Sequence, residues 1–442
     1  MVPSEKILAA VREHQADMVG VSGLITPSLE QMVLLANELE REGQDLPLLI
    51  GGATTSRTHT ALRIAPAYSG PVVWVPDASR AVTVCQNLAG ESTRTGYCAE
   101  VAADYARIRG QHAGKQGPAR FYTLDEARER RLNLDWSSYH PPAPQRPGRH
   151  TLRDYPLAEI ARYIDLTPFF QAWDLTGRFP RILDDATVGA AARDLYRDGS
   201  VMLQRIVDER WLTANAVFGI FPAFSAGDDI HVFATEDAAE PDLVWCNLRQ
   251  QTIKPQDRPN LCLADFVAPR DGPRDYLGAF ALTTGIGIET HLHRFAEKHD
   301  DYSAIMLKAL ADRLAEAFAE LLHLRVRREF WGYAHEETTS VDALVHEQYR
   351  GIRPAPGYPA CPDHSAKADL FRLLEVGHET GIELTESFAM YPAAAVSGFY
   401  FSHPQSSYFA VGKIDRDQAE DYASRRAVEL ATALRWLAPN LA

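Results

Sequence analysis

The sequence has few cysteines and few cationic residues for its length, and each shortage excludes a class of protein. Its 442 residues include five cysteines, and no two of them form a Cys-x-x-Cys pair. This spacing excludes the usual zinc frameworks and is typical of reduced thiols in a cytoplasmic protein. The 45 Lys and Arg residues are outnumbered by 59 Asp and Glu residues, giving a formal net charge of −14. Because nucleic acids and anionic membranes bind cationic surfaces, we expect neither as a partner.

Long apolar runs and a secretory leader are also missing from the sequence. No stretch approaches the roughly 18 uninterrupted apolar residues of a spanning helix, and the first residues lack a basic region followed by an apolar one. Apolar residues make up 46% of the chain and charged residues 24%, which excludes wholesale disorder. The sequence therefore predicts a cytoplasmic, globular protein, with two or three domains of about 150 residues each.

Strand and helix patterns alternate in the range 1–102. Short apolar, β-branched runs end near Ser22, Gly51 and Val75, with helical spacing between them. This order predicts a parallel α/β sheet, in which ligands bind where the strands end. A nicotinamide site would need Gly-x-Gly-x-x-Gly after a strand, and Gly51 and Gly52 do not begin that motif. Tight turns that bind no ligand would explain the same residues equally well.

The chain changes character after the α/β pattern. The range 103–150 is basic and ends in a proline-rich stretch, which predicts an arm followed by an extended linker. Short strands and one long helix follow in the range 151–442 and predict an α+β domain. Late strands are expected at 393–400 and 408–414.

The long helix is predicted at about 302–328. Five apolar residues form its buried stripe, namely Leu307, Leu310, Leu314, Phe318 and Leu321. Asp312 and Glu316, four residues apart beside Arg313, are expected to form part of the solvated face.

A proline-rich segment begins at Arg353. Four prolines follow it within nine residues, at 354, 356, 359 and 362, and hold the segment extended. An arginine in such a segment can clamp a carboxylate by a bidentate pair. Tyr358 offers a ring face and a hydroxyl to an adenosine or sulfonium group. On the residues alone, a proline-rich surface loop with an exposed arginine is the simpler explanation.

Several runs resemble cobalamin-dependent methionine synthase. Val21–Leu29, Leu49–Ser56 and Val75–Arg80 are similar to the cobalamin-binding domain of that family, and Gly351–Pro362 is the most specific likeness to its activation domain. The resemblance covers nearly all of the chain. It implies a partial, Rossmann-like α/β cobalamin domain, followed by an α+β activation domain with an antiparallel sheet and long helices.

The resemblance also implies site residues for two ligands. Cobalamin would contact Ser22, Thr26 and Ala78. The S-adenosylmethionine site would consist of Asp165, Arg353, Tyr358, Tyr408 and Phe409. Within that site Arg353 would hold the methionyl carboxylate and Asp165 the polar part of the ligand. Phe409 can supply only apolar or backbone contacts.

One residue that this chemistry requires is missing. In this family the lower ligand of cobalt is the histidine of an Asp-x-His-x-x-Gly motif. Of the 15 histidines only His231 has Asp two residues before it, and Ala234 stands where the glycine belongs. We therefore interpret His231 as a strand residue and expect the motif, with the first strands of the sheet, to precede this chain. Another chain or an upstream region would carry the ligand histidine and the homocysteine and folate modules.

The function that the resemblance implies is reactivation of methionine synthase. Flavodoxin or a related reductase would reduce cob(II)alamin, and S-adenosylmethionine would methylate the product to methylcobalamin. We do not expect this chain alone to make methionine. Two alternatives remain: a non-catalytic S-adenosylmethionine-binding module with a vestigial cobalamin domain, and a truncated gene whose full product is a complete synthase.

Overall fold

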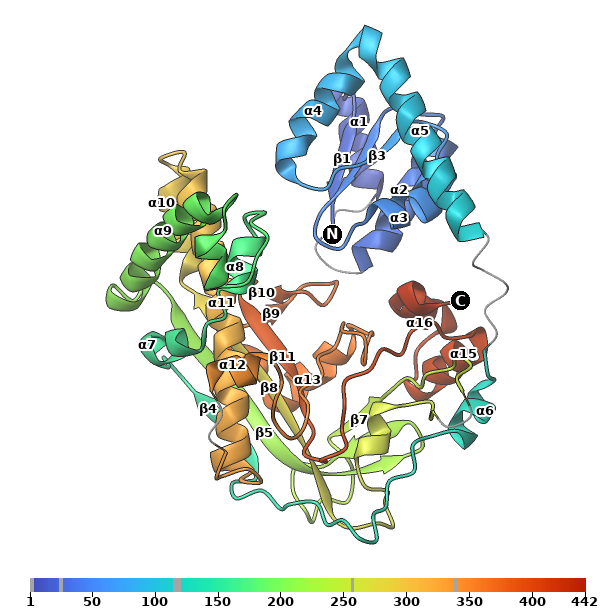
Figure 1. The fold of residues 1–442 in the computed structure, drawn as a ribbon. Coiled ribbons are helices and arrows are strands. Elements are labelled where there is room, and N and C mark those ends of the chain that lie inside the picture. Colours follow the sequence, from blue (N-terminus) through green and yellow to red (C-terminus); the bar gives the residue numbers. More distant parts are fainter. Residues whose placement is uncertain (1–3, 24–26, 114–120, 256–257, 338–339) are drawn as a thin grey trace. The chain divides into compact units, whose positions relative to one another are not determined.

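The computed structural model describes residues 4–23, 27–113, 121–255, 258–337 and 340–442 (Figure 1). The chain forms two compact units. The first comprises Met1–Phe121, Lys413–Ala423 and Val428–Ala442, and the second comprises Tyr122–Gly412 and Ser424–Ala427. Among the described residues, no helix is both long enough and apolar enough to cross a membrane.

The first unit contains a parallel sheet of three strands in the order β1-β2-β3, as the apolar runs predict. The strands are β1 (Val19–Ser22), β2 (Leu48–Gly51) and β3 (Val72–Trp74). The helices are α1 (Ser4–His14), α2 (Pro27–Arg41), α3 (Arg57–His59), α4 (Ala78–Ala89) and α5 (Glu91–Ala113).

Alternating side chains of β2 enter two different cores. Leu48 and Ile50 pack in a cluster with residues of α1 and α2, whereas Leu49 packs in a second cluster with Val84 and Leu88 of α4. Successive side chains of a strand point to opposite faces, so a strand that is covered on both sides is apolar throughout. This double burial explains the unbroken apolar run that predicted β2.

The second unit is built on an antiparallel sheet of six strands. Their order is β11-β8-β5-β6-β7, and β4 pairs with β5 in addition. The strands are β4 (Gly148–Leu152), β5 (Thr213–Ala226), β6 (Asp229–Val232), β7 (Leu243–Cys246), β8 (Asp275–Ile286) and β11 (Ala395–Tyr400). A separate two-stranded pair consists of β9 (Glu383–Leu384) and β10 (Met390–Tyr391).

The long predicted helix is α11 (Asp301–Arg325), which lies against β8 and β11 (Figure 1). Its start is capped by Asp300, whose carboxylate accepts a hydrogen bond from the backbone N–H of Ser303 at 3.0 Å. All five residues of the predicted apolar stripe are buried, which confirms the helical spacing. A π-helical turn at Val326–Phe330 continues the helix.

Shorter helices complete the structure. Those of the second unit are α6 (Leu124–Glu129), α7 (Leu157–Ile160), α8 (Thr167–Gln171), α9 (Gly189–Asp208), α10 (Ile288–Ala296), α12 (Val341–Val345), α13 (Ala366–Leu374) and α14 (Val376–Thr380). Near the C-terminus follow α15 (Arg416–Arg425) and α16 (Leu430–Leu437).

The α/β and α+β classes are confirmed, but one strand prediction is wrong. The range 408–414 forms no named strand. Its Val411 N–H instead donates to the carbonyl of Pro359 at 2.8 Å, so the segment is held by a loop. The three domain ranges remain a prediction; α5 runs through the boundary expected at residue 102, and β4 begins at Gly148 inside the expected linker.

Candidate functional site

The proline-rich segment is attached to the sheet beside β11. Ile352 donates its N–H to the carbonyl of Phe401 at 3.2 Å and accepts the N–H of Phe401 at 3.0 Å, and Phe399 donates to the carbonyl of Pro354 at 2.9 Å. Gly351 has φ +89°, and a Cβ there would lie 2.3 Å from the carbonyl oxygen of Phe401. Only glycine fits so close an approach. The backbone on both sides of Arg353 is therefore fixed.

The guanidinium of Arg353 is paired with Glu320 of α11. Its Nη1 donates to Oε2 of Glu320 at 2.7 Å, and its Nη2 donates to the other carboxylate oxygen. Burial alone would lower the pKa of Arg353, but the pairing with Glu320 raises it, so the arginine stays charged. Arg353 thus forms a bidentate pair with a carboxylate of the protein, and its binding of a ligand carboxylate stays a prediction.

Two further carboxylates, those of Glu316 and Glu347, are close enough to Arg353 to interact with its charge, and neither was predicted as a site residue. Burial raises the pKa of Glu316 on α11, while the charges of Arg313 and Arg353 oppose the rise. Burial also raises the pKa of Glu347, again opposed by Arg353. Glu316 is half-buried, so the expectation that it belongs to a solvated face is wrong; Asp312, by contrast, is exposed.

Two exposed tyrosines lie near the arginine. The backbone N–H of Arg353 donates to the hydroxyl of Tyr408 at 3.0 Å. Tyr358 sits in a turn closed by the N–H of Cys361, which donates to the carbonyl of Tyr358 at 2.9 Å. The side chains remain accessible, since Tyr358 is 63% exposed and Tyr408 is 40% exposed. Such aromatic faces can hold a flat or cationic group.

The other two residues predicted for this site have different surroundings. Asp165 precedes α8 and accepts the backbone N–H of Thr167 at 2.8 Å. Its neighbours Ile164 and Leu166 line a cavity of about 420 Å³. Phe409 packs inward, with its ring 6.4 Å from that of Phe266. Within the described parts of the chain, no hydrogen bond or ion pair joins Asp165 to Arg353, so the role of Asp165 stays a prediction.

A neutral histidine lies one turn beyond Glu320 on α11. The ring of His323 stacks on Tyr400, with centroids 4.9 Å apart, and meets Tyr349 edge-on at 4.9 Å. Burial lowers its pKa well below the usual value, and the nearby charges of Arg327 and Arg353 act in the same direction. His323 therefore supplies no positive charge that would compete for Glu320.

The predicted cobalamin residues lie at the ends of parallel strands in the first unit. Ser22 ends β1, is exposed, and pairs in register with Gly51 at the end of β2. Gly52 has φ +103°, and a Cβ there would lie 2.3 Å from the carbonyl oxygen of Gly23. Ala78 is the first residue of α4, and Thr26 lies outside the described residues. The glycine is required by the chain's own backbone at Gly23, and the cobalamin contacts of Ser22, Thr26 and Ala78 stay a prediction.

His231 is a strand residue, as the sequence predicts. It belongs to β6, and its ring stacks on that of Phe224 with centroids 4.9 Å apart. In the second unit this histidine therefore takes part in packing.

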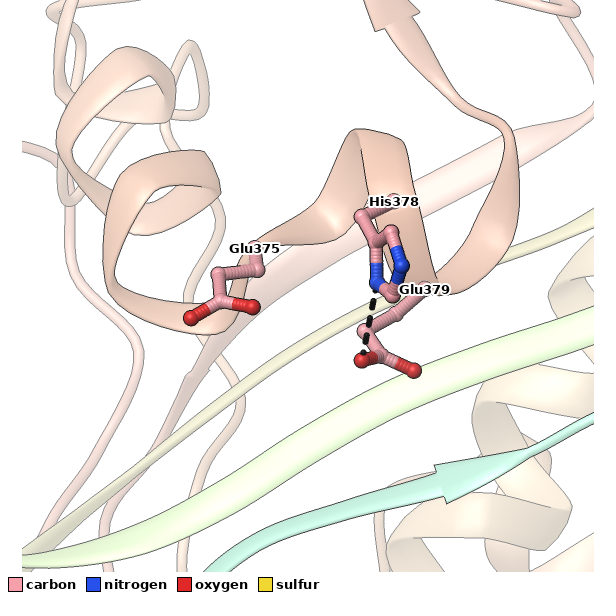
Figure 2. Close-up of side chains that lie close together, drawn as sticks. All are labelled: Glu375, His378 and Glu379. Atoms are coloured by element: carbon pink, nitrogen blue, oxygen red, sulfur yellow. Dashed lines mark hydrogen bonds and ion pairs between the residues drawn. The ribbon is translucent and has the colours of Figure 1, made fainter.

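One cluster has the composition of a metal site. Figure 2 shows Glu375, His378 and Glu379, whose ligand atoms all lie within 4.8 Å of one another. Both carboxylates are already neutralised, because Glu375 pairs with Arg149 at 2.8 Å and Glu379 pairs with Arg153 at 3.0 Å. The cluster thus acts as an ion-pair network beside β4, and we assign no metal to it.

Comparisons with known proteins agree with this fold. Residues 156–427 match the family model for the activation domain of vitamin B12-dependent methionine synthase, and residues 1–70 match the model for a B12-binding domain. A crystal structure of the MetH reactivation domain bound to AdoHcy is similar to this chain, with 50% sequence identity and a TM-score of 0.71. The match covers 73% of this chain and 98% of that chain. The activation-domain model covers more than half of the residues, and the chain therefore belongs to the vitamin B12-dependent methionine synthase family.

Proposed function

We propose that this protein binds S-adenosylmethionine at Arg353 and cobalamin at the strand ends of its first unit, and that it carries out reductive methylation of cob(II)alamin. The observation that carries the proposal is the charged Arg353 guanidinium, which lies near two exposed tyrosines, Tyr358 and Tyr408. The similar reactivation domain is described as bound to AdoHcy, the product that S-adenosylmethionine leaves after giving up its methyl group.

The charges around Arg353 favour this ligand. S-adenosylmethionine carries a carboxylate, an ammonium and a sulfonium group, and so has a net charge of +1 at neutral pH. Two guanidiniums, those of Arg313 and Arg353, interact with the carboxylates of Glu316, Glu320 and Glu347, and Arg313 also pairs with Asp312. The carboxylates outnumber the guanidiniums, which leaves the site with excess negative charge. Arg353 can hold the ligand's carboxylate while the surrounding carboxylates stabilise its two cationic groups. AdoHcy lacks the sulfonium charge, so the surrounding carboxylates stabilise it less than they stabilise S-adenosylmethionine.

The protein has to orient its ligands more than it has to move protons. Reduced cobalamin, when bound, supplies the nucleophile, and the sulfonium is already an activated methyl donor. The backbone ties at Ile352 and Phe399 keep Arg353 in place, and Arg353 fixes the methionyl end of the donor. Ser22, Thr26 and Ala78 are the proposed cobalamin contacts, and Asp165 and Phe409 complete the proposed S-adenosylmethionine site.

The proposal includes partners and a location. An electron must come from flavodoxin or a related reductase, because the transfer starts from cob(II)alamin. A cobalt-ligating histidine, together with the homocysteine and folate modules, would come from another chain or an upstream region. We place the protein in the cytoplasm.

The second candidate function is S-adenosylmethionine binding without catalysis. A transfer assay separates it from the first. The purified chain is incubated with cob(II)alamin, a reducing system and S-adenosylmethionine labelled in its methyl group, and labelled methylcobalamin is measured. Reactivation predicts label in cobalamin at a rate above that of a protein-free control. Tight binding of S-adenosylmethionine without such transfer would support the binding module instead.

A further inference from the structure

We infer that Glu320 is a positioning residue for Arg353, which fixes one edge of the guanidinium and so directs another edge to the carboxylate of the ligand. The inference rests on the proposed binding of S-adenosylmethionine at Arg353. It concerns a residue of α11 that neither the motifs nor the family resemblance assigned to the site.

The argument begins with the hydrogen-bonding capacity of arginine. A guanidinium has five N–H donors, and Glu320 takes one from each terminal nitrogen of Arg353. Three donors remain on the other edges of the same plane. A second carboxylate can therefore bind Arg353 while Glu320 keeps its place, and the angle at which it binds is set by Glu320.

Glu320 should remain paired with Arg353 when the ligand binds. Only 15% of the Arg353 side chain and 14% of the Glu320 side chain are exposed, so separating the pair would leave two poorly solvated charges. Glu320 also experiences like charges, because Glu316 and Glu347 interact electrostatically both with Arg353 and with Glu320 itself, and without Arg353 this repulsion would be unopposed.

The surroundings of Glu320 make it the specific partner of Arg353. Its neighbours Phe318, Ala319, Leu321 and Leu322 are buried, so the helix cannot rotate without breaking the core. The next arginines along the chain are bound by other carboxylates, since Arg325 pairs with Glu329 at 2.8 Å and Arg327 pairs with Glu337 at 2.7 and 2.8 Å. Without Glu320, Arg353 would be free to turn toward Glu316 or Glu347 and away from the ligand.

The test measures preference for a carboxylate and not affinity alone. Calorimetry gives the dissociation constants of S-adenosylmethionine and of decarboxylated S-adenosylmethionine for the wild type, Glu320→Ala, Glu320→Gln and Glu347→Gln. The last variant removes the same unit charge from the surroundings of Arg353 but leaves the pair with Glu320 intact. Thermal unfolding of each variant shows whether it folds, and the nearly isosteric Glu320→Gln serves if Glu320→Ala does not.

We expect the wild type to bind S-adenosylmethionine more tightly than the decarboxylated form. The ratio of the two dissociation constants expresses this preference, and we expect it to be about tenfold smaller in both Glu320 variants than in Glu347→Gln. An unchanged preference in folded Glu320 variants would overturn the inference while leaving the proposed function intact. A higher preference would also overturn it, because Glu320 would then be a competitor for Arg353. A wild type that does not bind S-adenosylmethionine would contradict the proposed function itself.

Discussion

The hydroxyl of Tyr408 accepts the backbone N–H of Arg353 at 3.0 Å and so joins two segments that are 55 residues apart in sequence. This bond keeps an exposed aromatic ring next to the clamp that is proposed to hold a carboxylate. It also gives Tyr408 a function that phenylalanine cannot perform.

We expect Tyr408→Phe to weaken binding of S-adenosylmethionine about five- to tenfold, since a hydrogen bond of this kind contributes about 1 kcal/mol. Calorimetry measures the loss. Tyr391→Phe is a suitable control, because Tyr391 is also exposed and its hydroxyl donates to Glu289 at 2.8 Å. Equal affinities for wild type and Tyr408→Phe would mean that the bond does not organise the site.

Binding of S-adenosylmethionine should weaken on acidification. Burial raises the pKa of Glu316 and of Glu347 above the ordinary glutamate value, so both take up protons at a higher pH than exposed glutamates do. Each proton removes a negative charge that stabilises the ammonium and sulfonium groups, and affinity falls as pH falls through those pKa values. Binding titrations across the acidic range should show a smaller fall in affinity for AdoHcy than for S-adenosylmethionine. In Glu316→Gln the fall in affinity for S-adenosylmethionine should be smaller than in the wild type. Identical pH profiles for the two ligands would contradict this account.

Stability of the second unit should depend on one buried arginine. Arg249 pairs with Asp228 and Asp265, each at 2.7 Å, and all three side chains are buried. Burial would raise the pKa of Asp228, but Arg249 and Arg128 outweigh it and hold that pKa low. Removing the arginine takes this partner from the buried Asp265 and leaves Asp228 with Arg128, so Arg249→Ala should lower the free energy of unfolding by about 3–5 kcal/mol.

Chemical denaturation of this variant needs an exposed pair for comparison. Arg197 is 66% exposed and pairs with Asp194. Arg197→Ala should lower the free energy of unfolding of the protein by less than about 1 kcal/mol. Equal free energies of unfolding for Arg249→Ala and Arg197→Ala would mean that the ion pairs of Arg249 do not stabilise the second unit.

Cobalamin bound to the purified chain should lack the spectrum of imidazole coordinated to cobalt. The sequence contains no Asp-x-His-x-x-Gly motif, and the nearest approximation, His231, is packed against Phe224 in β6. Absorption spectra with added methylcobalamin test this expectation. A spectrum with histidine bound to cobalt would refute it and would point to an unexpected ligand.

The fold was predictable wherever burial leaves a regular apolar pattern. The runs that became β1, β2 and β3 and the stripe of α11 are of this kind. The long strand β8 was missed because it is rich in small residues. At Gly278, for example, a Cβ would lie 2.8 Å from that of Tyr400, so the neighbouring strand requires glycine there. The range 408–414 was predicted as a strand but is not one. Its apolar residues resemble a strand, but the N–H of Val411 bonds to a loop.

The candidate site was predictable only in part. Arg353 and Tyr408 were identified by family resemblance, and the structure joins them by a hydrogen bond. Glu320 and Glu347 were missed, because carboxylates on helices and loops usually face water. A signal for Glu320 does exist: Glu316, Glu320 and His323 lie at helical spacing on a helix that is otherwise largely apolar.

The central claim is that Arg353 holds the carboxylate of S-adenosylmethionine. Calorimetry on the wild type, Arg353→Ala and Arg353→Lys tests it most directly, with Arg274→Ala as an exposed arginine control. The account predicts a loss of at least about 30-fold for Arg353→Ala, partial binding for Arg353→Lys, which keeps the charge but not the fork, and no change for the control. Equal affinity of the wild type and a folded Arg353→Ala protein would contradict the account.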